Sequence, residues 1–197
     1  MPQLPSFLAP CVLVLVTGCA REVAPEPVAG ATPAANKEEA RQPGTPLEFT
    51  TPAGWLAETP TSSMRKAQYR LPRAAGDAED GECVVYWFGA GGGGGVDANL
   101  ERWCTQFAQT DGRDSKELLV RSERRVADMV VHEVALSGTF VAETAPGSGE
   151  RVNKPGFAMQ AAILESDHGA YYVKLVGPAA TVAQHAAAFR ELVSGVR

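Results

Sequence analysis

A run of six consecutive apolar residues, Cys-Val-Val-Tyr-Trp-Phe at positions 83–88, constrains the fold of this chain more than any other segment. Its length is typical of a β-strand, in which successive side chains point to opposite faces of the sheet. Because both sets of side chains are apolar, we expect both faces of the sheet to be covered here and the strand to lie near the sheet's centre. The sequence therefore predicts a sheet with other parts of the chain packed against it.

Six further segments have the alternation or composition of strands. They span residues 47–50, 64–71, 118–126, 129–141, 157–165 and 171–176. Residues 127–128 form a tight turn between the third and fourth of these segments, and residues 166–169 form one between the last two. Because consecutive strands joined by tight turns pair antiparallel, we expect an antiparallel sheet of about six to seven strands.

Two segments have the period of an amphipathic helix. The first is expected to begin with Asp97 as its N-cap, and its apolar stripe consists of residues 100, 103, 104 and 107. The second spans residues 182–196, with Thr181 and Gln184 forming a capping box. Two helices that cover one or both faces of the sheet give an α+β fold, which we assign to a single domain over residues 47–197.

The N-terminus has the features of an export signal. Residues 1–18 carry no charged side chain, and the apolar stretch at 8–16 is too short to span a bilayer. It ends in Val16-Thr17-Gly18-Cys19, which resembles the lipobox of bacterial lipoproteins. The resemblance implies that residues 1–18 are a cleaved signal peptide and that Cys19 carries a diacylglyceryl group, with palmitate as an acyl chain. The alternatives are an ordinary cleaved signal peptide and a short apolar segment followed by a chance cysteine.

The residues that follow Cys19 bear on where the protein is held. Ala20 stands where many lipoproteins of the inner membrane have Asp, so the resemblance slightly favours the outer membrane of a bacterial cell envelope. Residues 19–46 are rich in Ala and Pro and contain no aromatic residue, which leaves too little apolar surface for folding. We expect this segment to be a tether that holds the domain away from the membrane.

Several short motifs follow one another along the domain. They are Phe49 with Pro52-Ala53-Gly54-Trp55, Met64-Arg65 with Tyr69 and Leu71-Pro72, Asn99-Leu100-Glu101-Arg102-Trp103 with Gln106-Phe107, and Lys174 with Gly177-Pro178 and Phe189. This succession resembles a group of uncharacterised bacterial envelope lipoproteins whose domain is similar to the PsbP-like α/β/α fold. That fold includes photosystem accessory subunits and partners of small GTPases, so the resemblance implies a binding or scaffolding module rather than an enzyme. A fold does not by itself determine a function.

The four cysteines fall into three groups. Cys11 leaves with the predicted signal peptide, Cys19 is the predicted lipidation site, and Cys83 and Cys104 remain in the domain. An exported domain meets an oxidising compartment, and the strand and helix that carry these two thiols have similar lengths, so a disulfide between Cys83 and Cys104 is possible. The alternative is that both are buried thiols that pack as small apolar side chains.

No residue pattern points to catalysis or to a bound cofactor. The glycine run at 91–95 matches the dinucleotide-binding pattern only because any glycine run does, and we interpret it as a flexible connector or, alternatively, a flap that contacts a peptide. His132, His168 and His185 lack the spacing of zinc ligands, and Ser148 lacks the first glycine of a nucleophile elbow. We therefore expect no catalytic residue, no cofactor and no metal site.

Tyr86, Tyr172 and Lys174 are the candidate binding residues, because their positions in the predicted strands can border a groove. The net charge of −5 disfavours binding to nucleic acid and electrostatic attraction to anionic lipid. The expected contacts are therefore the membrane, through the lipid on Cys19, and a protein partner in the envelope. The sequence predicts a non-enzymatic, lipid-anchored module that binds or scaffolds a protein. The alternative is a lipoprotein that binds a small molecule or lipid in a cavity between sheet and helices.

Overall fold

The computed structural model describes residues 46–144 and 147–197, which form an α+β domain. Its elements, in chain order, are β1 (Leu56–Glu58), β2 (Arg65–Leu71), β3 (Gly81–Trp87), α1 (Val96–Cys104), β4 (Phe107–Ala108), α2 (Ser115–Leu118), β5 (Val120–Val126), β6 (Met129–Phe140), β7 (Lys154–Ser166), β8 (Gly169–Pro178), α3 (Ala179–Gln184) and α4 (Ala186–Ser194). The predicted signal peptide, the lipidation site Cys19 and the tether lie outside the described residues. In the described part of the chain, no helix is long and apolar enough to cross a membrane.

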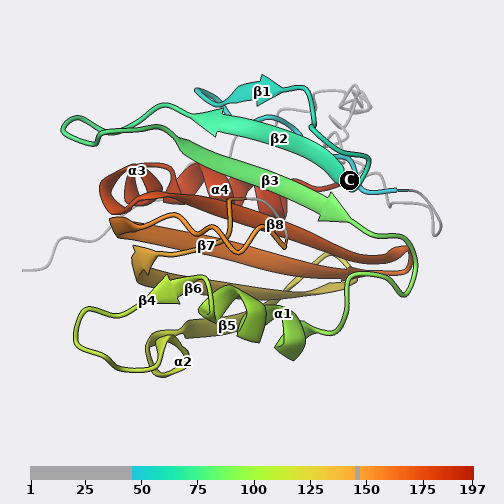
Figure 1. Cartoon of the computed structure of the whole chain (residues 1–197). Helices are drawn as coiled ribbons and strands as arrows, with labels where there is room; N and C mark the ends of the chain where they lie inside the picture. Colours follow the sequence, from blue (N-terminus) through green and yellow to red (C-terminus); the bar gives the residue numbers. More distant parts are fainter. Residues whose placement is uncertain (1–45, 145–146) are drawn as a thin grey trace, which may run out of the picture. The chain divides into compact units, whose positions relative to one another are not determined.

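All strands belong to one antiparallel sheet, with the order β1-β2-β3-β8-β7-β6-β4 (Figure 1). Strand β5 also pairs with β6, over a different part of that long strand from β4. The α+β class and the antiparallel pairing are thus confirmed, and the sheet has eight strands rather than six or seven. Strand β3 lies between β2 and β8, as expected for an apolar run with neighbours on both sides.

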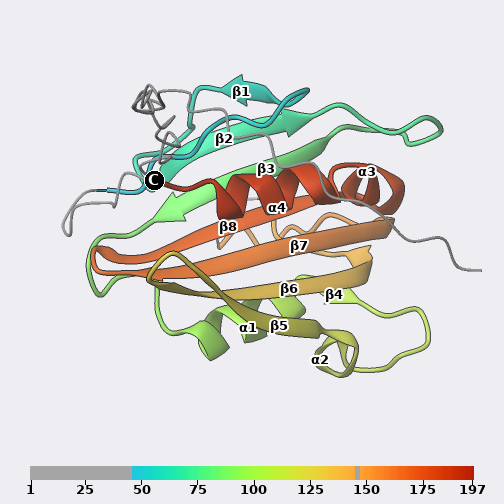
Figure 2. The ribbon, with the colours of Figure 1, turned by 180° about the vertical axis from the view of Figure 1, so that it is seen from behind.

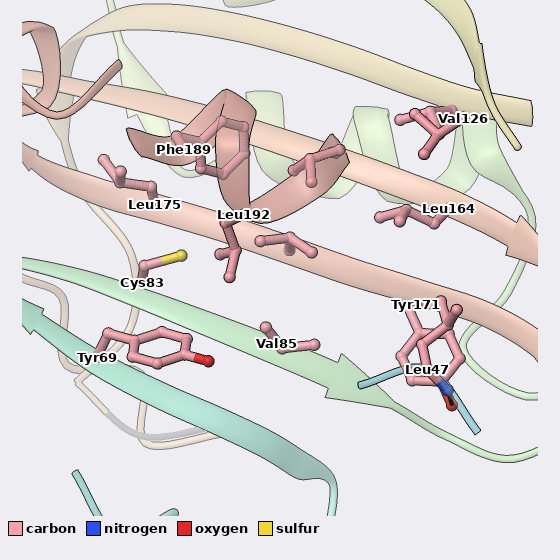
Figure 3. Close-up of a cluster of buried hydrophobic side chains, with 14 of the residues drawn as sticks. Leu47, Tyr69, Cys83, Val85, Val126, Leu164, Tyr171, Leu175, Phe189 and Leu192 are labelled. Atoms are coloured by element: carbon pink, nitrogen blue, oxygen red, sulfur yellow. Dashed lines mark hydrogen bonds between the residues drawn. The ribbon is translucent and has the colours of Figure 1, made fainter. Parts of the chain in front are cut away.

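Helices cover both faces of the sheet. Helix α1 lies on the face seen in Figure 1, and α3 and α4 lie on the opposite face, seen in Figure 2. We call these the α1 face and the α4 face. On the α4 face, Phe189, Leu192 and Val193 pack against alternate residues of β3 and β8 (Figure 3). On the α1 face, Leu100 and Trp103 pack against residues of β6, β7 and β8.

The predicted disulfide between Cys83 and Cys104 is wrong. Both are buried free thiols, and they belong to different apolar clusters. Cys83 packs with Val85 and α4 (Figure 3), whereas Cys104 packs on the α1 face. Because side chains alternate along a strand, the side chain of Cys83 points to the face opposite Cys104, and the sheet separates the two sulfur atoms. Burial also raises the pKa of each thiol.

The N-terminal part of the domain differs from the sequence prediction. Residues 47–50 form no strand, although Glu48 and Arg197 exchange two backbone hydrogen bonds, of 2.8 and 3.3 Å. The backbone N–H of Leu47 donates to the hydroxyl of Tyr171, 3.1 Å away, in the core. The first strand is instead β1, an exposed three-residue edge strand whose apolar alternation is too short to be recognised in the sequence.

The helix caps also differ from the sequence prediction. The N-cap of α1 is Gly95 rather than Asp97, and the side-chain amide of Asn99 donates to the carbonyl groups of Gly93 and Gly95, both at 2.9 Å. The expected final helix is divided at His185 into α3 and α4. Asp77, 104 positions before Thr181 in the sequence, takes the place of the predicted capping box.

The loop before β3 caps α3. The carboxylate of Asp77 accepts hydrogen bonds from the backbone N–H (2.8 Å) and the hydroxyl (2.5 Å) of Thr181, in the first turn of the helix. The same hydroxyl accepts a bond from the backbone N–H of Ala74, 3.0 Å away. One end of the β2–β3 loop is therefore held against the helices of the α4 face.

Candidate functional site

The candidate site is a groove of about 360 Å³ on the α1 face, over the part of β2, β3 and β8 that α1 leaves uncovered. Its floor comes from alternate residues of β3 and β8, and its sides come from the loop before β3 and from the segments before and within β7. The residues that matter most for its chemistry are Arg65, Glu79, Glu82, Tyr86, Phe140, Lys154 and Lys174. Two of the three predicted binding residues, Tyr86 and Lys174, therefore line one groove.

Lys174 lies on the floor of this groove, opposite Val84 of β3. Its ammonium donates a hydrogen bond to Oε1 of Gln106 and lies 5.5 Å from the ring centre of Phe140. Part of the side chain remains accessible from the groove, yet burial lowers the pKa of the ammonium to about 8, with the Glu82 carboxylate opposing the shift. Burial disfavours the charged form because the ammonium loses its hydration.

Gln106 is held in place by its own backbone. Its N–H donates to the carbonyl of Trp103, 3.1 Å away, at the end of α1, and its carbonyl accepts from the N–H of Val141, 2.8 Å away. The backbone of Gln106, which carries the side-chain amide that contacts Lys174, is thus hydrogen-bonded both to the end of the helix and to the segment after β6. The sequence motif that includes Gln106 gives this residue no binding role, because Gln106 belongs to the connection between α1 and β4.

The other charged groups around the groove are in ion pairs, except Glu143, whose carboxylate accepts a hydrogen bond from the backbone N–H of Gly147 at 2.8 Å. Arg65 Nη1 contacts Glu82 Oε1 at 3.0 Å, and Lys154 forms an ion pair with Glu79. Asp80 contacts Arg70 Nη1 at 2.8 Å, and this guanidinium lowers the pKa of its carboxyl. Within the described residues, Lys174 has no carboxylate at ion-pair distance and makes its only hydrogen bond to an amide.

Tyr86 forms an aromatic part of the groove floor. Its ring is stacked with that of Phe88, with ring centres 6.1 Å apart, and the guanidinium of Arg65 lies 5.6 Å from its centre. The side chain is only half-buried, and burial raises the pKa of its hydroxyl. Tyr86 therefore offers a ring and a protonated hydroxyl to whatever enters the groove.

Tyr172 lies on the same face but is not part of the groove surface. It is buried beneath the glycine run, and its hydroxyl donates to the carbonyl of Gly94 at 2.6 Å. A Cβ atom on Gly93 would lie 2.5 Å from Cε2 of Tyr172, so the chain passes too close for any other residue. The prediction that Tyr172 presents a binding surface is therefore wrong, since it packs against residues 92–94 instead.

Two smaller hollows lie on the α4 face, between the helices and β5, β6 and β7. Their volumes are about 130 and 250 Å³, and both are lined by Val120, Ala135 and Gln160. Val120 is 67% exposed, so these hollows are shallow depressions at the surface. Sites for small molecules usually have volumes of about 300–1,000 Å³ and enclose most of the ligand.

His132 and His185 have separate contacts in the fold. His132 lies between the carboxylates of Glu123 and Glu165, at 3.3 and 3.0 Å. His185 accepts a hydrogen bond from Trp55 Nε1 through Nδ1, 3.1 Å away, and its Nε2 contacts the carbonyl of Pro72 at 2.9 Å. Across residues 46–144 and 147–197, no three His, Cys, Asp or Glu side chains are placed to hold a metal ion.

A scan of the chain against models of known protein families finds no match, and a search of curated proteins finds none either. The functional proposal therefore depends on the geometry of the groove. Most of its residues were not predicted, because Arg65, Phe140 and Lys154 are distant in sequence and share no motif. The one signal was the alternation of β8, in which Lys174 occupies a position on the same face as Tyr172 and Val176.

Proposed function

We propose that this protein is a non-enzymatic lipoprotein of the bacterial cell envelope whose groove on the α1 face binds a protein partner. The lipid on Cys19 would hold the domain at a membrane, the outer membrane being favoured, and residues 20–46 would give the domain reach. The observation that carries the proposal is the juxtaposition of Tyr86, Phe140 and Lys174 in a groove open to solvent. Aromatic side chains, tyrosine above all, are enriched at protein-binding surfaces.

The layering of the domain supports a PsbP-like fold. Helix α1 lies on one face of the antiparallel sheet and α3 and α4 lie on the other, which is the α/β/α order of PsbP-like domains. We propose on this ground, together with the sequence resemblance, that the domain is PsbP-like. Domains of that class act as binding modules, in agreement with the proposed role.

The contacts inside the groove favour binding over catalysis. General acid–base and nucleophilic catalysis usually rely on a reactive group that a neighbouring acid or base orients or activates. Lys174 contacts an amide, and the neighbouring carboxylates of Glu79 and Glu82 are engaged by Lys154 and Arg65. The alternative function, a carrier of a small molecule or lipid between sheet and helices, is less favoured because the hollows there are small and shallow.

The proposal is tested by crosslinking the full chain in intact cells and purifying it with its partners. Tyr86→Ala and Lys174→Met alter the groove, and Lys66→Met is the matched control, since Lys66 lies over the Trp87 ring on the opposite face, 4.5 Å from its centre. We expect a partner that is captured by the wild type and the control and lost from both groove variants. The same set of captured proteins from all four forms would contradict the proposal.

A further inference from the structure

The ammonium of Lys174 has donors to spare. A lysine ammonium carries three N–H donors, and the described residues provide one acceptor, Oε1 of Gln106. The ring of Phe140 on one side adds a weak cation–π contact but accepts no conventional hydrogen bond. Burying a charged group with unused donors is unfavourable unless a partner is supplied. The groove is open at this point, so an incoming ligand can supply that partner.

The charge balance of the groove selects the kind of anion. The cations Arg65 and Lys154 are each paired with a carboxylate, so an incoming anion meets one unpaired positive charge, on Lys174. The lining also holds four carboxylates, those of Glu79, Asp80, Glu82 and Glu143. A doubly charged phosphate group would be repelled by them more strongly than a singly charged carboxylate.

Several apolar side chains lie in the groove with Lys174, although most of the groove surface is polar. Tyr86, Phe140 and Phe157 contribute rings, and Val84 and Val176 contribute aliphatic side chains on the floor. A ligand that fits this surface therefore carries an apolar or aromatic group next to its anionic group.

We infer that Lys174 is the anchor of a carboxylate-binding subsite, which takes an acidic side chain or a C-terminal carboxylate of a peptide segment that also places an apolar side chain between Tyr86 and Phe140. The inference rests on the proposed function and names the chemistry by which the groove recognises its partner. No covalent step is involved. The carboxylate replaces water as the acceptor for the free N–H donors of the ammonium.

The test uses the full chain, purified in detergent, and four probes, one of which is inorganic phosphate as the competing anion. N-acetylphenylalanine has a terminal carboxylate beside a ring, N-acetylphenylalanine amide is its neutral counterpart, and an N-acetylated Phe-Asp-Phe amide presents a side-chain carboxylate. Binding is measured by calorimetry and by the NMR signal of the Lys174 ammonium. We expect at least one of the two carboxylate probes to bind at about pH 6.5 and to perturb that signal. The neutral amide should bind at least about tenfold more weakly.

The pH dependence provides a second readout. Because burial holds the pKa of Lys174 near 8, only a small fraction of the ammonium remains charged at about pH 9.5, so the affinity should fall by about thirtyfold. Lys174→Met should remove carboxylate binding, Lys66→Met should leave it unchanged, and Lys174→Arg should keep it at both pH values. Should Lys174→Met fail to fold, Lys174→Arg and the wild-type pH series still decide the question.

Three results would overturn the inference. They are equal binding of the acid and its amide, unchanged carboxylate affinity in Lys174→Met, and tighter binding of inorganic phosphate than of either carboxylate probe. The two proposals can fail separately. A crosslinked partner that is lost from Tyr86→Ala but kept by Lys174→Met would support the protein-binding groove and contradict the carboxylate subsite. Carboxylate binding without any crosslinked partner would support the subsite and contradict the protein-binding role.

Discussion

At the scale of single residues, the glycine run shows how one close contact can require a residue type. Gly91 and Gly93 both have positive φ, +73° and +84°, but only Gly93 lies against side chains, those of Tyr172 and Phe88. The glycine run therefore packs against the rest of the domain at Gly93, its middle residue. Its five glycines are not equivalent, and their separate roles can be measured.

Gly93→Ala and Gly91→Ala separate backbone strain from the steric clash. For Gly91→Ala we expect a loss of about 1 kcal/mol in the free energy of unfolding, because alanine tolerates positive φ poorly. Gly93→Ala adds a contact of 2.5 Å with Tyr172, so the loss should reach about 2–4 kcal/mol. Urea unfolding measures both values. Equal losses would show that the glycine run does not pack against Tyr172.

The buried ammonium of Lys174 makes stability depend on pH in a defined direction. Its pKa is lowered to about 8 in the folded protein, below that of an exposed lysine, so the unfolded chain binds more protons between these values. Stability therefore rises with pH in this interval, and the charge penalty is fully present below it. From about pH 7 to about pH 9.5 we expect Lys174 to contribute a gain of about 1–2 kcal/mol.

The matched measurement for this gain is the difference between the wild type and Lys174→Met in urea unfolding at the two pH values. The variant removes the titrating group while keeping a side chain of similar length, so other titrating groups contribute equally to both proteins. The free energy of unfolding of the wild type, relative to that of Lys174→Met, should rise with pH by this amount. A difference that does not change with pH would show that the ammonium is well hydrated in the folded protein.

At the scale of elements, the caps of the helices depend on residues that are distant in sequence. Asp97 has the position of an N-cap but forms an ion pair with Arg121 at 3.0 Å, and its side chain is 88% exposed. Asp77, in the loop before β3, has no helix near it in sequence and nevertheless caps α3. A local pattern can identify only caps that come from the helix itself.

Asp77→Ala and Asp97→Ala test this assignment. We expect Asp77→Ala to lower the free energy of unfolding by about 1–2 kcal/mol, because two hydrogen bonds at the start of α3 are lost. Asp97→Ala should cost less than about 0.5 kcal/mol, as is usual for exposed ion pairs. Thermal and urea unfolding give both values. A larger loss for Asp97→Ala would favour the cap expected from the sequence.

At the scale of the whole molecule, the proposed anchor and the groove lie in separate parts of the chain. Cys19 precedes the domain by a segment rich in Ala and Pro, and the groove is built entirely from residues 65–176. The lipid should therefore determine where the protein is found without affecting how the domain folds.

Cys19→Ala tests this separation. We expect the wild type in the membrane fraction and the variant in the soluble fraction of the envelope, because two or three acyl chains give stable membrane binding and none remains in the variant. Circular dichroism of the purified variant should show an unchanged domain. A wild-type protein that is already soluble would contradict the lipobox prediction and favour an ordinary cleaved signal peptide.

Local patterns in the sequence were enough to predict much of this domain. The period of two in residues 129–141 and 157–165 predicted β6 and β7, and the period of 3.6 around Trp103 predicted α1. Such patterns suffice because alternation and helical period depend only on neighbours along the chain. Strand β1 was missed for the same reason, since three exposed residues carry no pattern.

Only the tertiary structure decided which side chains from distant parts of the sequence meet on the same face of the sheet. It placed Cys83 and Cys104 on opposite faces, covered Tyr172 with the glycine run, and brought Lys174 together with Gln106, Phe140 and the paired charges of the groove. These outcomes depend on strand order and on which helix covers which face. Both are set by packing between segments that are up to 130 residues apart, which no local pattern records.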